Sequence, residues 1–371
     1  MKKLFWVSLG CAVAGWATAQ VLQSETFESG FTLGDLDGQN GWFVLPGDAL
    51  PSVSTGMGTI SSVMARSGTR SVRLDSSLLF SGESLFAFKP LAAPVLAGTS
   101  SIVFSEFWLR YTSVSGTNAG GASYDSGGNF LAGLLIDSQD GKTYPTWLAG
   151  ASTISAVSSA QWVRLTAVHN MLTSQVRGYV NGNLVSSTTG TFVAANFSDF
   201  DMFADGEGTN QVYFDDVKIE KFAFGAIRGT VTLQDYQAPS TGVPVRIRLL
   251  NATTNAVVQT FNTTLNANGE FTVNTSNRGT FKLEIKPWHW VSKTLTGITV
   301  IDEGVYFLTS THANGDPDNS DEVDAADIDL VIANFGQLGD PNSIAADVNG
   351  SGEVDAADID VVIVNFGEIG G

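Results

Sequence analysis

One acidic sequence pattern occurs twice in the last fifty-odd residues of the chain. Residues 316–327 (DPDNSDEVDAAD) and residues 347–358 (DVNGSGEVDAAD) begin 31 positions apart, and each leads into an apolar segment. Oxygen-bearing side chains at positions 1, 3, 5 and 12 of such a loop are the ligands that calcium prefers. Because the pattern is duplicated, it predicts a small structural unit built around bound calcium.

The predicted metal ligands occupy equivalent positions in the two loops, with position 7 using its carbonyl and position 9 acting through water. They are Asp316, Asp318, Ser320, Glu322, Asp324 and Asp327, then Asp347, Asn349, Ser351, Glu353, Asp355 and Asp358. At the sharp turn of position 6 the second loop has Gly352, whereas the first has Asp321, which adopts a left-handed backbone less readily. Serine at position 5 and aspartate at position 12 are weak ligands, so we expect a Kd of roughly 10⁻⁴ to 10⁻³ M, weaker in the first loop.

The segment after each loop has the spacing of a short amphipathic helix. Apolar residues recur at i, i+4 and i+7, and a glycine that can stop the helix follows. The residues are Ile328, Ile332, Phe335 and Gly336 in the first copy and Ile359, Ile363, Phe366 and Gly367 in the second. The two apolar faces are predicted to pack against each other.

Residues 314–371 therefore resemble a dockerin, the duplicated calcium-loop and helix module that docks onto a cohesin domain. The resemblance implies bound Ca²⁺ and a cohesin-like protein or cell-surface scaffold as partner. Cellulosomal dockerins usually carry a polar pair at loop positions 10 and 11, where this chain has Ala-Ala at 325/326 and 356/357. Docking to a partner therefore stays open beside an alternative, in which the module caps its own chain.

Residues 20–222 contain strand-like runs that alternate apolar and polar residues between turn residues, and Asn181-Gly182 between two such runs predicts a tight hairpin. Several segments resemble concanavalin A-like (laminin-G or glucanase type) jelly rolls: Phe-Glu at 27–28, GQNGW at 38–42, YVNG at 179–182 and FDDV at 214–217. The resemblance implies a two-sheet sandwich that engages a glycan or surface ligand, often with a structural calcium near the chain ends. Candidate ligands for that calcium are Glu28, Asp215 and Asp216, and candidate sugar-stacking residues in turn-rich segments are Trp42, Tyr144 and Trp147.

Residues 223–300 contain four further strand-like runs, 227–233, 243–249, 269–273 and 279–286. They resemble the carboxypeptidase regulatory-like, transthyretin-type sandwich, which implies a small Ig-like spacer without catalysis of its own. Residues 301–313 are predicted to be a linker to the C-terminal unit, with residues 305–308 as an alternative further strand. The predicted fold class is thus multidomain and mainly all-β: a jelly roll, a small β-sandwich and a small α-helical EF-hand pair.

No catalytic pattern stands out. The Glu-x-Asp-x-(x)-Glu run of jelly-roll glucanases is missing, and the nearest acidic pairs are Asp199 with Asp201 and Asp205 with Glu207. Carboxylates two residues apart on a strand share a face, but such pairs are more often loop or metal-binding groups. We therefore assign no catalytic residue.

The N-terminus is predicted to be a secretory signal, residues 1–19, with a basic start, an apolar run at 4–15 and an Ala-Thr-Ala cleavage site. Its removal would take away Cys11, the only cysteine, so no disulfide is expected. The net charge is −18, and the stretch from His312 onward holds 14 Asp and Glu with no Lys or Arg. Such a field repels nucleic acid and anionic membranes.

Together these features predict a secreted or cell-surface, bacterial-type protein without a membrane span in its mature form. Its leading function is non-catalytic: the jelly roll binds a glycan or surface ligand, and the C-terminal unit binds calcium and a partner. One alternative is a polysaccharide-degrading enzyme, either a glycoside hydrolase or a lyase, with its site in the jelly roll. The other is a structural protein in which the C-terminal unit is an intramolecular cap.

Overall fold

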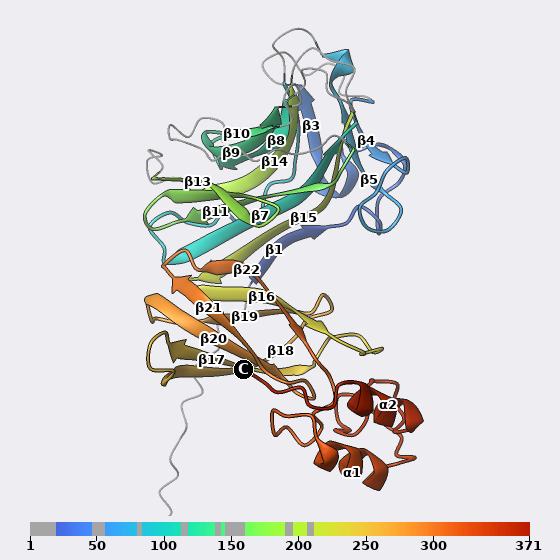
Figure 1. Cartoon of the computed structure of the whole chain (residues 1–371). Helices are drawn as coiled ribbons and strands as arrows, with labels where there is room; N and C mark the ends of the chain where they lie inside the picture. The colour runs from blue at the N-terminus through green and yellow to red at the C-terminus, as the bar shows by residue number, and fades with distance from the viewer. Residues whose placement is uncertain are drawn as a thin grey trace, which may run out of the picture.

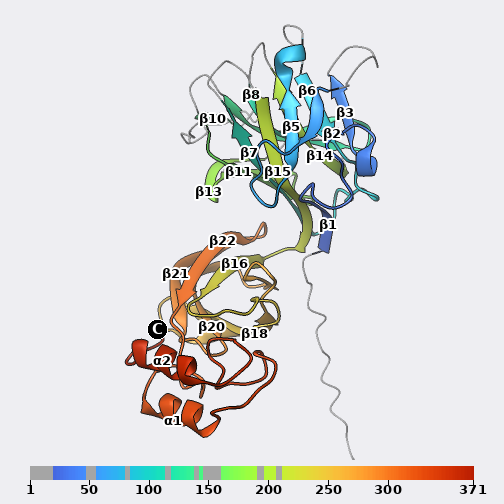
Figure 2. The same cartoon turned by 90° about the vertical axis from the view of Figure 1, so that its right-hand side faces the viewer.

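The computed structural model describes residues 20–46, 56–79, 84–112, 118–137, 142–144, 160–189, 196–205 and 211–371. The predicted signal, residues 1–19, lies outside them. Three parts follow one another along the described chain: a large β-sandwich, a small β-sandwich and a pair of short helices (Figures 1 and 2). The helices lie beside the small sandwich, at the end away from the large one.

The large sandwich consists of two antiparallel sheets. The nine-stranded sheet comprises β13 (Asn183–Thr189), β12 (Gln175–Val180), β11 (Val163–Asn170), β7 (Ser101–Tyr111), β15 (Gln211–Ala223), β5 (Ser71–Asp75), β4 (Gly58–Ser61) and β2 (Gly34–Asp35), with β1 (Gln20–Glu25) paired to β15. The six-stranded sheet comprises β10 (Lys142–Tyr144), β9 (Phe130–Asp137), β8 (Asn118–Asp125), β14 (Phe197–Asp205), β6 (Ser84–Phe88) and β3 (Phe43–Pro46). Two single-turn 3₁₀ helices, η1 (Gln39–Gly41) and η2 (Ser76–Leu78), lie in connections.

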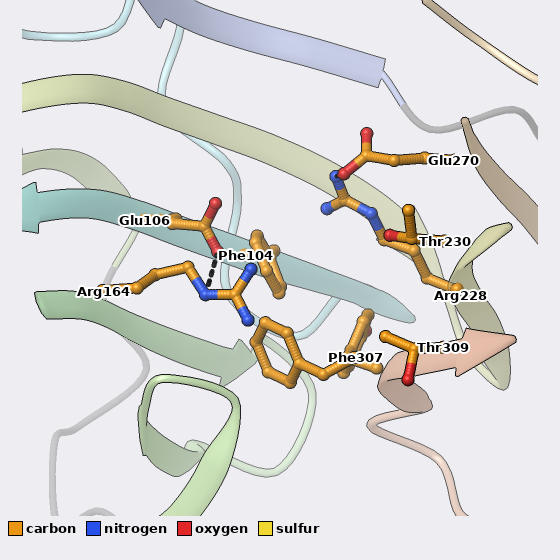
Figure 3. A pocket seen from close by; sticks show the side chains of 10 residues that line it. Phe104, Glu106, Arg164, Arg228, Thr230, Glu270, Phe307 and Thr309 are labelled. Atoms are coloured by element: carbon orange, nitrogen blue, oxygen red, sulfur yellow. Dashed lines mark hydrogen bonds and ion pairs between the residues drawn. The ribbon is translucent and has the colours of Figure 1, made fainter. Parts of the chain in front are cut away.

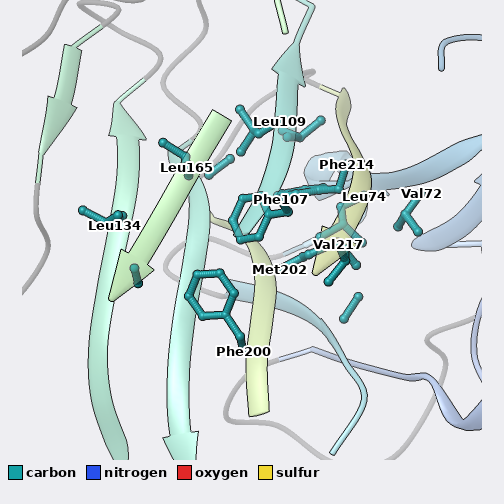
Figure 4. Close-up of a cluster of buried hydrophobic side chains, with 14 of the residues drawn as sticks. Val72, Leu74, Phe107, Leu109, Leu134, Leu165, Phe200, Met202, Phe214 and Val217 are labelled. Atoms are coloured by element: carbon teal, nitrogen blue, oxygen red, sulfur yellow. The ribbon is translucent and has the colours of Figure 1, made fainter. Parts of the chain in front are cut away.

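Alternating side chains of both sheets fill the space between them, as the period-2 pattern predicts. Phe107 and Phe214 from one sheet meet Phe200 and Met202 from the other, and all four are buried (Figure 4). The predicted Asn181-Gly182 hairpin is confirmed, because both residues have positive φ between β12 and β13. The sequence pattern thus specifies which face of each strand enters the core.

The small sandwich pairs a three-stranded sheet with a four-stranded one around its own core. The sheets comprise β19 (Glu270–Asn274), β16 (Ala226–Leu233) and β22 (Val305–His312), and then β18 (Val257–Thr264), β17 (Pro244–Asn251), β20 (Gly279–Pro287) and β21 (Lys293–Val300). The predicted linker 301–313 is corrected by this arrangement, since most of it forms β22, which runs parallel to β16. Long-range pairing, which the local sequence does not encode, makes this segment a strand.

The two sandwiches pack directly against each other. Only two residues separate β15 from β16, and the rings of Phe104 and Tyr306 meet across the joint with centroids 5.2 Å apart. Buried Arg228 donates to Glu220 (2.6 Å) on β15 and to Glu270 (2.9 Å) on β19. A cavity of about 80 Å³ remains in the joint, lined by these aromatic and charged side chains (Figure 3). A joint with paired buried charges fixes the two sandwiches relative to each other.

Helices α1 (Ala325–Ala333) and α2 (Ala356–Val364) follow the two acidic loops, and Gly336 and Gly367 after them have positive φ. The predicted packing face is corrected. Val331 and Val362 are the fully buried apolar residues, and the predicted face residues Ile328 and Ile359 pack partly buried against the same core. The other four predicted face residues are more than half exposed, namely Ile332, Phe335, Ile363 and Phe366. Val331 and Val362 join a small core with Val291 of the small sandwich, so the helices bury the valine face and leave the other face in solvent. Neither described helix has the length needed to cross a bilayer.

Candidate functional site

The first acidic loop gathers three of its predicted ligands around one point. Asp316, Asp318 and Asp327 each offer a carboxylate oxygen, and these atoms lie within 4.8 Å of one another. Asp316 is completely buried, and its Oδ1 has no hydrogen-bond partner. An unpartnered buried carboxylate oxygen beside two other carboxylates is the donor set of a hard divalent cation, so this triad can hold a metal ion.

The other oxygen of Asp316 is occupied. Its Oδ2 accepts from the backbone N–H of Asp321 (3.0 Å) and from Lys286 Nζ (2.5 Å), which comes from β20 of the small sandwich. Asp321 has φ of 74°, confirming the left-handed backbone that its position requires. The carboxylate of Asp316 is therefore oriented with one oxygen toward the lysine and the other toward the triad.

The second loop repeats this geometry with backbone donors only. Asp347 Oδ1 accepts from Ser351 N (3.0 Å) and its Oδ2 from Gly352 N (2.8 Å). Asp358 Oδ1 accepts from Asn349 N (3.0 Å). The loop thus places Asp347, Asn349 and Asp358 as the first loop places its triad, with an amide in place of one carboxylate.

The remaining predicted ligands have other partners. Asp324 and Asp355 are N-cap residues, since they accept from the backbone of Ala326 (2.7 Å) and Ala357 (2.8 Å). The predicted ligands at positions 5 and 7 bond to each other in both loops: Ser320 Oγ to Glu322 O (3.1 Å) and Ser351 Oγ to Glu353 O (3.0 Å). Each serine hydroxyl therefore bonds to the carbonyl group two residues later in its own loop.

Burial disfavours negative charge at position 12. It raises the pKa of Asp327 to about 6, and the pKa of Asp358 is also raised by burial. A bound cation would favour the ionised carboxylates, so protons and metal compete for the same oxygens.

A second acidic site lies on the outer face of the six-stranded sheet. Asp199 and Asp201 on β14 are each 7% exposed and line a groove of about 510 Å³. The rest of the lining is apolar or aromatic on one side (Leu45, Phe86, Phe88, Pro90 and Tyr124) and polar on the other (Asp125, Ser126, Gly128 and Ser198). Of the interpretation that such a pair is a loop or metal-binding group, the loop part is corrected, because both residues are buried on β14. Of the second predicted pair, Asp205 ends β14 and Glu207 lies outside the described residues.

The two groove carboxyls share one environment. Burial, together with the neighbouring Asp199, raises the pKa of Asp201 well above its usual value, and burial also raises the pKa of Asp199. The charged form of both carboxyl groups is therefore disfavoured, and Asp201 Oδ1 is buried without a hydrogen-bond partner. Burial and both aspartates raise the pKa of Tyr124 to about 12, so its hydroxyl stays a donor. The groove therefore offers two buried carboxyl groups and a phenol beside aromatic rings.

The three residues predicted to bind a calcium ion in the jelly roll each bond to groups of one turn, residues 66–70. Glu28 accepts from Thr69 and Arg70 N–H, both at 2.6 Å. Asp215 accepts from Arg66 N (2.8 Å), and Asp216 pairs with the Arg66 guanidinium. Among the described residues, only the first-loop triad brings three acidic groups close enough for a metal ion. The carboxylates of Glu28, Asp215 and Asp216 have their partners in the turn at 66–70.

The three candidate stacking residues are not brought together. Trp42 is completely buried against Phe27, so the prediction that it stacks on a sugar is corrected: its ring belongs to the core. Tyr144 ends β10 at the edge of the six-stranded sheet. Trp147 lies outside the described residues.

Two functional side chains escaped the sequence analysis. Lys286 lies on the same face of β20 as Lys282 and Glu284, so the sequence pattern predicts that its side chain points to solvent. In the structure it is buried against the first loop. Tyr124 comes from β8 and reaches the groove because β8 pairs with β14. No local signal marks either residue, since both acquire their roles from distant segments.

Comparison with known proteins bears on the large sandwich. Residues 92–226 match the family described as the concanavalin A-like lectin/glucanases superfamily. No curated protein matches the chain. Similar solved structures include cellulose induced protein Cip1 (14% identity, TM-score 0.40, covering 53% of this chain and 96% of that one). Another is β-agarase A from Zobellia galactanivorans (8% identity, TM-score 0.36, covering 56% of this chain and 93% of that one). A third is a type II cohesin–X–dockerin complex from Acetivibrio cellulolyticus (14% identity, TM-score 0.31, covering 39% of this chain and 97% of that one). With the two-sheet topology and the family match, the large sandwich has a concanavalin A-like jelly-roll fold.

Proposed function

We propose that this protein is a secreted or cell-surface glycan-binding protein whose jelly roll holds a carbohydrate in the groove over Asp199 and Asp201. The observation that carries the proposal is the chemistry of that groove. Aromatic and apolar side chains provide faces for sugar rings, and the two carboxyl groups and the Tyr124 hydroxyl provide bonds to sugar hydroxyls. The concanavalin A-like fold is consistent with this role.

The test is a binding screen of the full chain against polysaccharides and oligosaccharides, followed by calorimetry on the best ligand. Tyr124→Ala and Asp201→Ala should each weaken binding by about tenfold or more, because each removes a directed hydrogen bond in a desolvated groove. Asp235→Asn is the matched control, since Asp235 lies in a turn of the small sandwich. Equal affinity in all three variants would refute the groove as the binding site.

In the same proposal, the C-terminal residues 314–371 are a dockerin-like module that binds Ca²⁺ in the two loops. The unpartnered Asp316 Oδ1 and the repeated loop geometry support this assignment. The first ion would be held by Asp316, Asp318 and Asp327, and the second by Asp347, Asn349 and Asp358. When bound, the ion would tie the start of each loop to the first turn of its helix.

The exposed helix faces support a partner, which we propose to be a cohesin-like protein. Ile332, Phe335, Ile363 and Phe366 are each 55–58% exposed, and the two copies present the same residue types. The Ala-Ala pairs at 325/326 and 356/357 are also exposed in the first turn of each helix. A pull-down with the full chain, with and without calcium, tests this, and Phe335→Ser with Phe366→Ser should abolish capture.

A polysaccharide-degrading enzyme is the second candidate, and the Asp199–Asp201 pair is the observation that favours it. A buried carboxyl group whose pKa is raised beside a second carboxyl group is an arrangement that suits a general acid. Release of reducing ends or unsaturated products from a bound polysaccharide, lost in Asp201→Asn, would establish this activity. Binding without any product would leave the non-catalytic function.

A further inference from the structure

The first acidic loop is in contact with a cation that belongs to the chain itself. Lys286 Nζ donates to Asp316 Oδ2 and to the carbonyl oxygen of Trp290, both at 2.5 Å. The side chains of Lys286 and Asp316 are 2% and 0% exposed. A buried ammonium group persists only with a compensating charge and with its donors bonded, and here both come from fixed backbone and loop groups.

The lysine leaves the metal side of the loop free. It binds Oδ2 of Asp316, whereas Oδ1 has no partner and belongs to the triad with Asp318 and Asp327. Lysine and metal ion would therefore sit on opposite oxygens of one carboxylate. The positive charge of Lys286 supplies part of what a bound ion would supply, and it repels an ion bound beside it.

Asp321 adds a second attachment at the same place. Its carboxylate accepts from the backbone N–H and the hydroxyl of Ser292, both at 2.6 Å, and lies 3.9 Å from Lys286 Nζ. The equivalent residue of the second loop is Gly352, which has no side chain to reach the small sandwich. The substitution at position 6 therefore anchors the first loop to the strands beside it.

The second loop has neutral contacts only. Gln237 N donates to Asn349 O (2.8 Å), and Asn314 Nδ2 donates to Val348 O (2.7 Å). Within the described part of the chain, no lysine or arginine forms an ion pair with residues 347–358. Asp347 and Asp358 thus face each other across the loop without a cation from the protein.

We propose that Lys286 is a resident counter-cation of the first loop, so that the two loops depend differently on calcium. The first loop stays folded and docked on the small sandwich without calcium, and it binds the ion weakly. The second loop becomes ordered when calcium binds. The inference rests on the proposed calcium binding only for its second half, because the contacts of Lys286 exist without any ion.

Hydrogen exchange of the full chain, followed by mass spectrometry in EGTA and in calcium, tests this without a variant. In EGTA, amides of residues 316–327 should exchange at least about tenfold more slowly than those of 347–358. Calcium should slow exchange mainly in the second loop. Equal exchange of the two loops in EGTA, or faster exchange of the first, would overturn the proposal.

Lys286→Met tests the same idea in the opposite direction. The variant removes the charge but keeps most of the side-chain volume, so the first loop should lose its protection in EGTA and regain it in calcium. The calcium Kd of the first loop, measured by calorimetry on the full chain, should fall at least about tenfold relative to the unaltered chain, since the repelling charge is gone. Lys282→Met is the control, because Lys282 on the same strand bonds the exposed Asn255 side chain.

An unchanged or higher calcium Kd of the first loop in Lys286→Met contradicts a counter-cation role. If the variant does not fold, the exchange comparison in the unaltered chain still decides. Failure of both loops to respond to calcium would refute the calcium part of the proposed function. Loss of the difference between the loops in EGTA would refute this inference alone.

Discussion

Two regions of this protein bury carboxyl groups, and they compensate the charge in different ways. In the groove, Asp199 and Asp201 lie two residues apart on β14, and burial with the neighbouring Asp199 raises the pKa of Asp201, which favours its uncharged form. In the first loop, Asp316 is compensated by the ammonium group of Lys286. Removal of one charge should therefore have opposite effects: it breaks a pair in the loop and relieves repulsion in the groove.

The largest effect is expected from Lys286→Ala in calcium-free buffer. The change leaves Asp316 buried without its partner, which costs about 3–5 kcal/mol of unfolding free energy. Chemical denaturation of the full chain, read at the transition of the C-terminal half, measures this loss. Lys282→Ala should leave that transition in place, and adding Asp316→Asn to Lys286→Met should recover much of the loss. If Lys286→Ala left the unfolding free energy almost unchanged, the loop and the groove would not differ in the effect of removing one charge.

Calcium removal is expected to have the next largest effect. At a free calcium concentration of 100 times Kd, binding stabilises the folded module by about 2.7 kcal/mol, and EGTA abolishes that term. Scanning calorimetry of the full chain with and without EGTA measures the difference. Asp347→Ala should reproduce most of the EGTA effect if the second loop is the calcium-dependent one, and an unchanged calcium response in this variant would contradict that assignment.

In the groove, Asp201→Asn should stabilise the jelly roll at neutral pH by roughly 1–2 kcal/mol. The folded-state pKa of Asp201 lies above its unfolded value, so the folded state binds the extra proton. Stability of the unaltered jelly roll therefore falls as pH rises from the unfolded value of about 4 through the raised folded value. The amide variant lacks this loss.

Urea unfolding at several pH values checks the sign. The gain from Asp201→Asn should be largest near pH 7 and disappear near pH 4, where both chains carry a neutral group. Asp235→Asn, in an exposed turn, should show no such trend. A destabilising effect at pH 7 would mean that the ionised Asp201 is compensated by a group other than a proton.

The smallest effect on stability is expected from Phe335→Ser and Phe366→Ser, within about 0.5 kcal/mol each, because both rings are more than half exposed. Val331→Ser and Val362→Ser lie at fully buried positions of the same helices. Each should lower the unfolding free energy by more than about 1 kcal/mol, because a buried apolar side chain is lost. Thermal unfolding compares the four variants. Large losses from the phenylalanine variants would show that these rings stabilise the module and are not available to a partner.

Much of the architecture followed from local pattern. Local pattern predicted strands in both sandwiches, although β18 and β21 of the small one were not among the four runs predicted there. Asn181-Gly182 predicted a hairpin, and the glycines after each acidic loop predicted where the helices end. The helix face was predicted wrongly because i, i+4, i+7 spacing selects isoleucine and phenylalanine, whereas the small module buries the shorter Val331 and Val362. Strand β22 was read as a linker because its partner β16 lies more than seventy residues earlier.

The sequence by itself determined that Asp316, Asp318 and Asp327 come together, since the three residues lie close together in one loop of the chain. It also determined the strand faces of the jelly roll, because side chains alternate strictly along a strand. Tertiary structure alone decided that Trp42 is core, that Tyr124 joins Asp199 and Asp201, and that Lys286 reaches Asp316. These contacts join segments about 30 to 80 residues apart, and the charge and burial they create arise only when sheets and loops pack together.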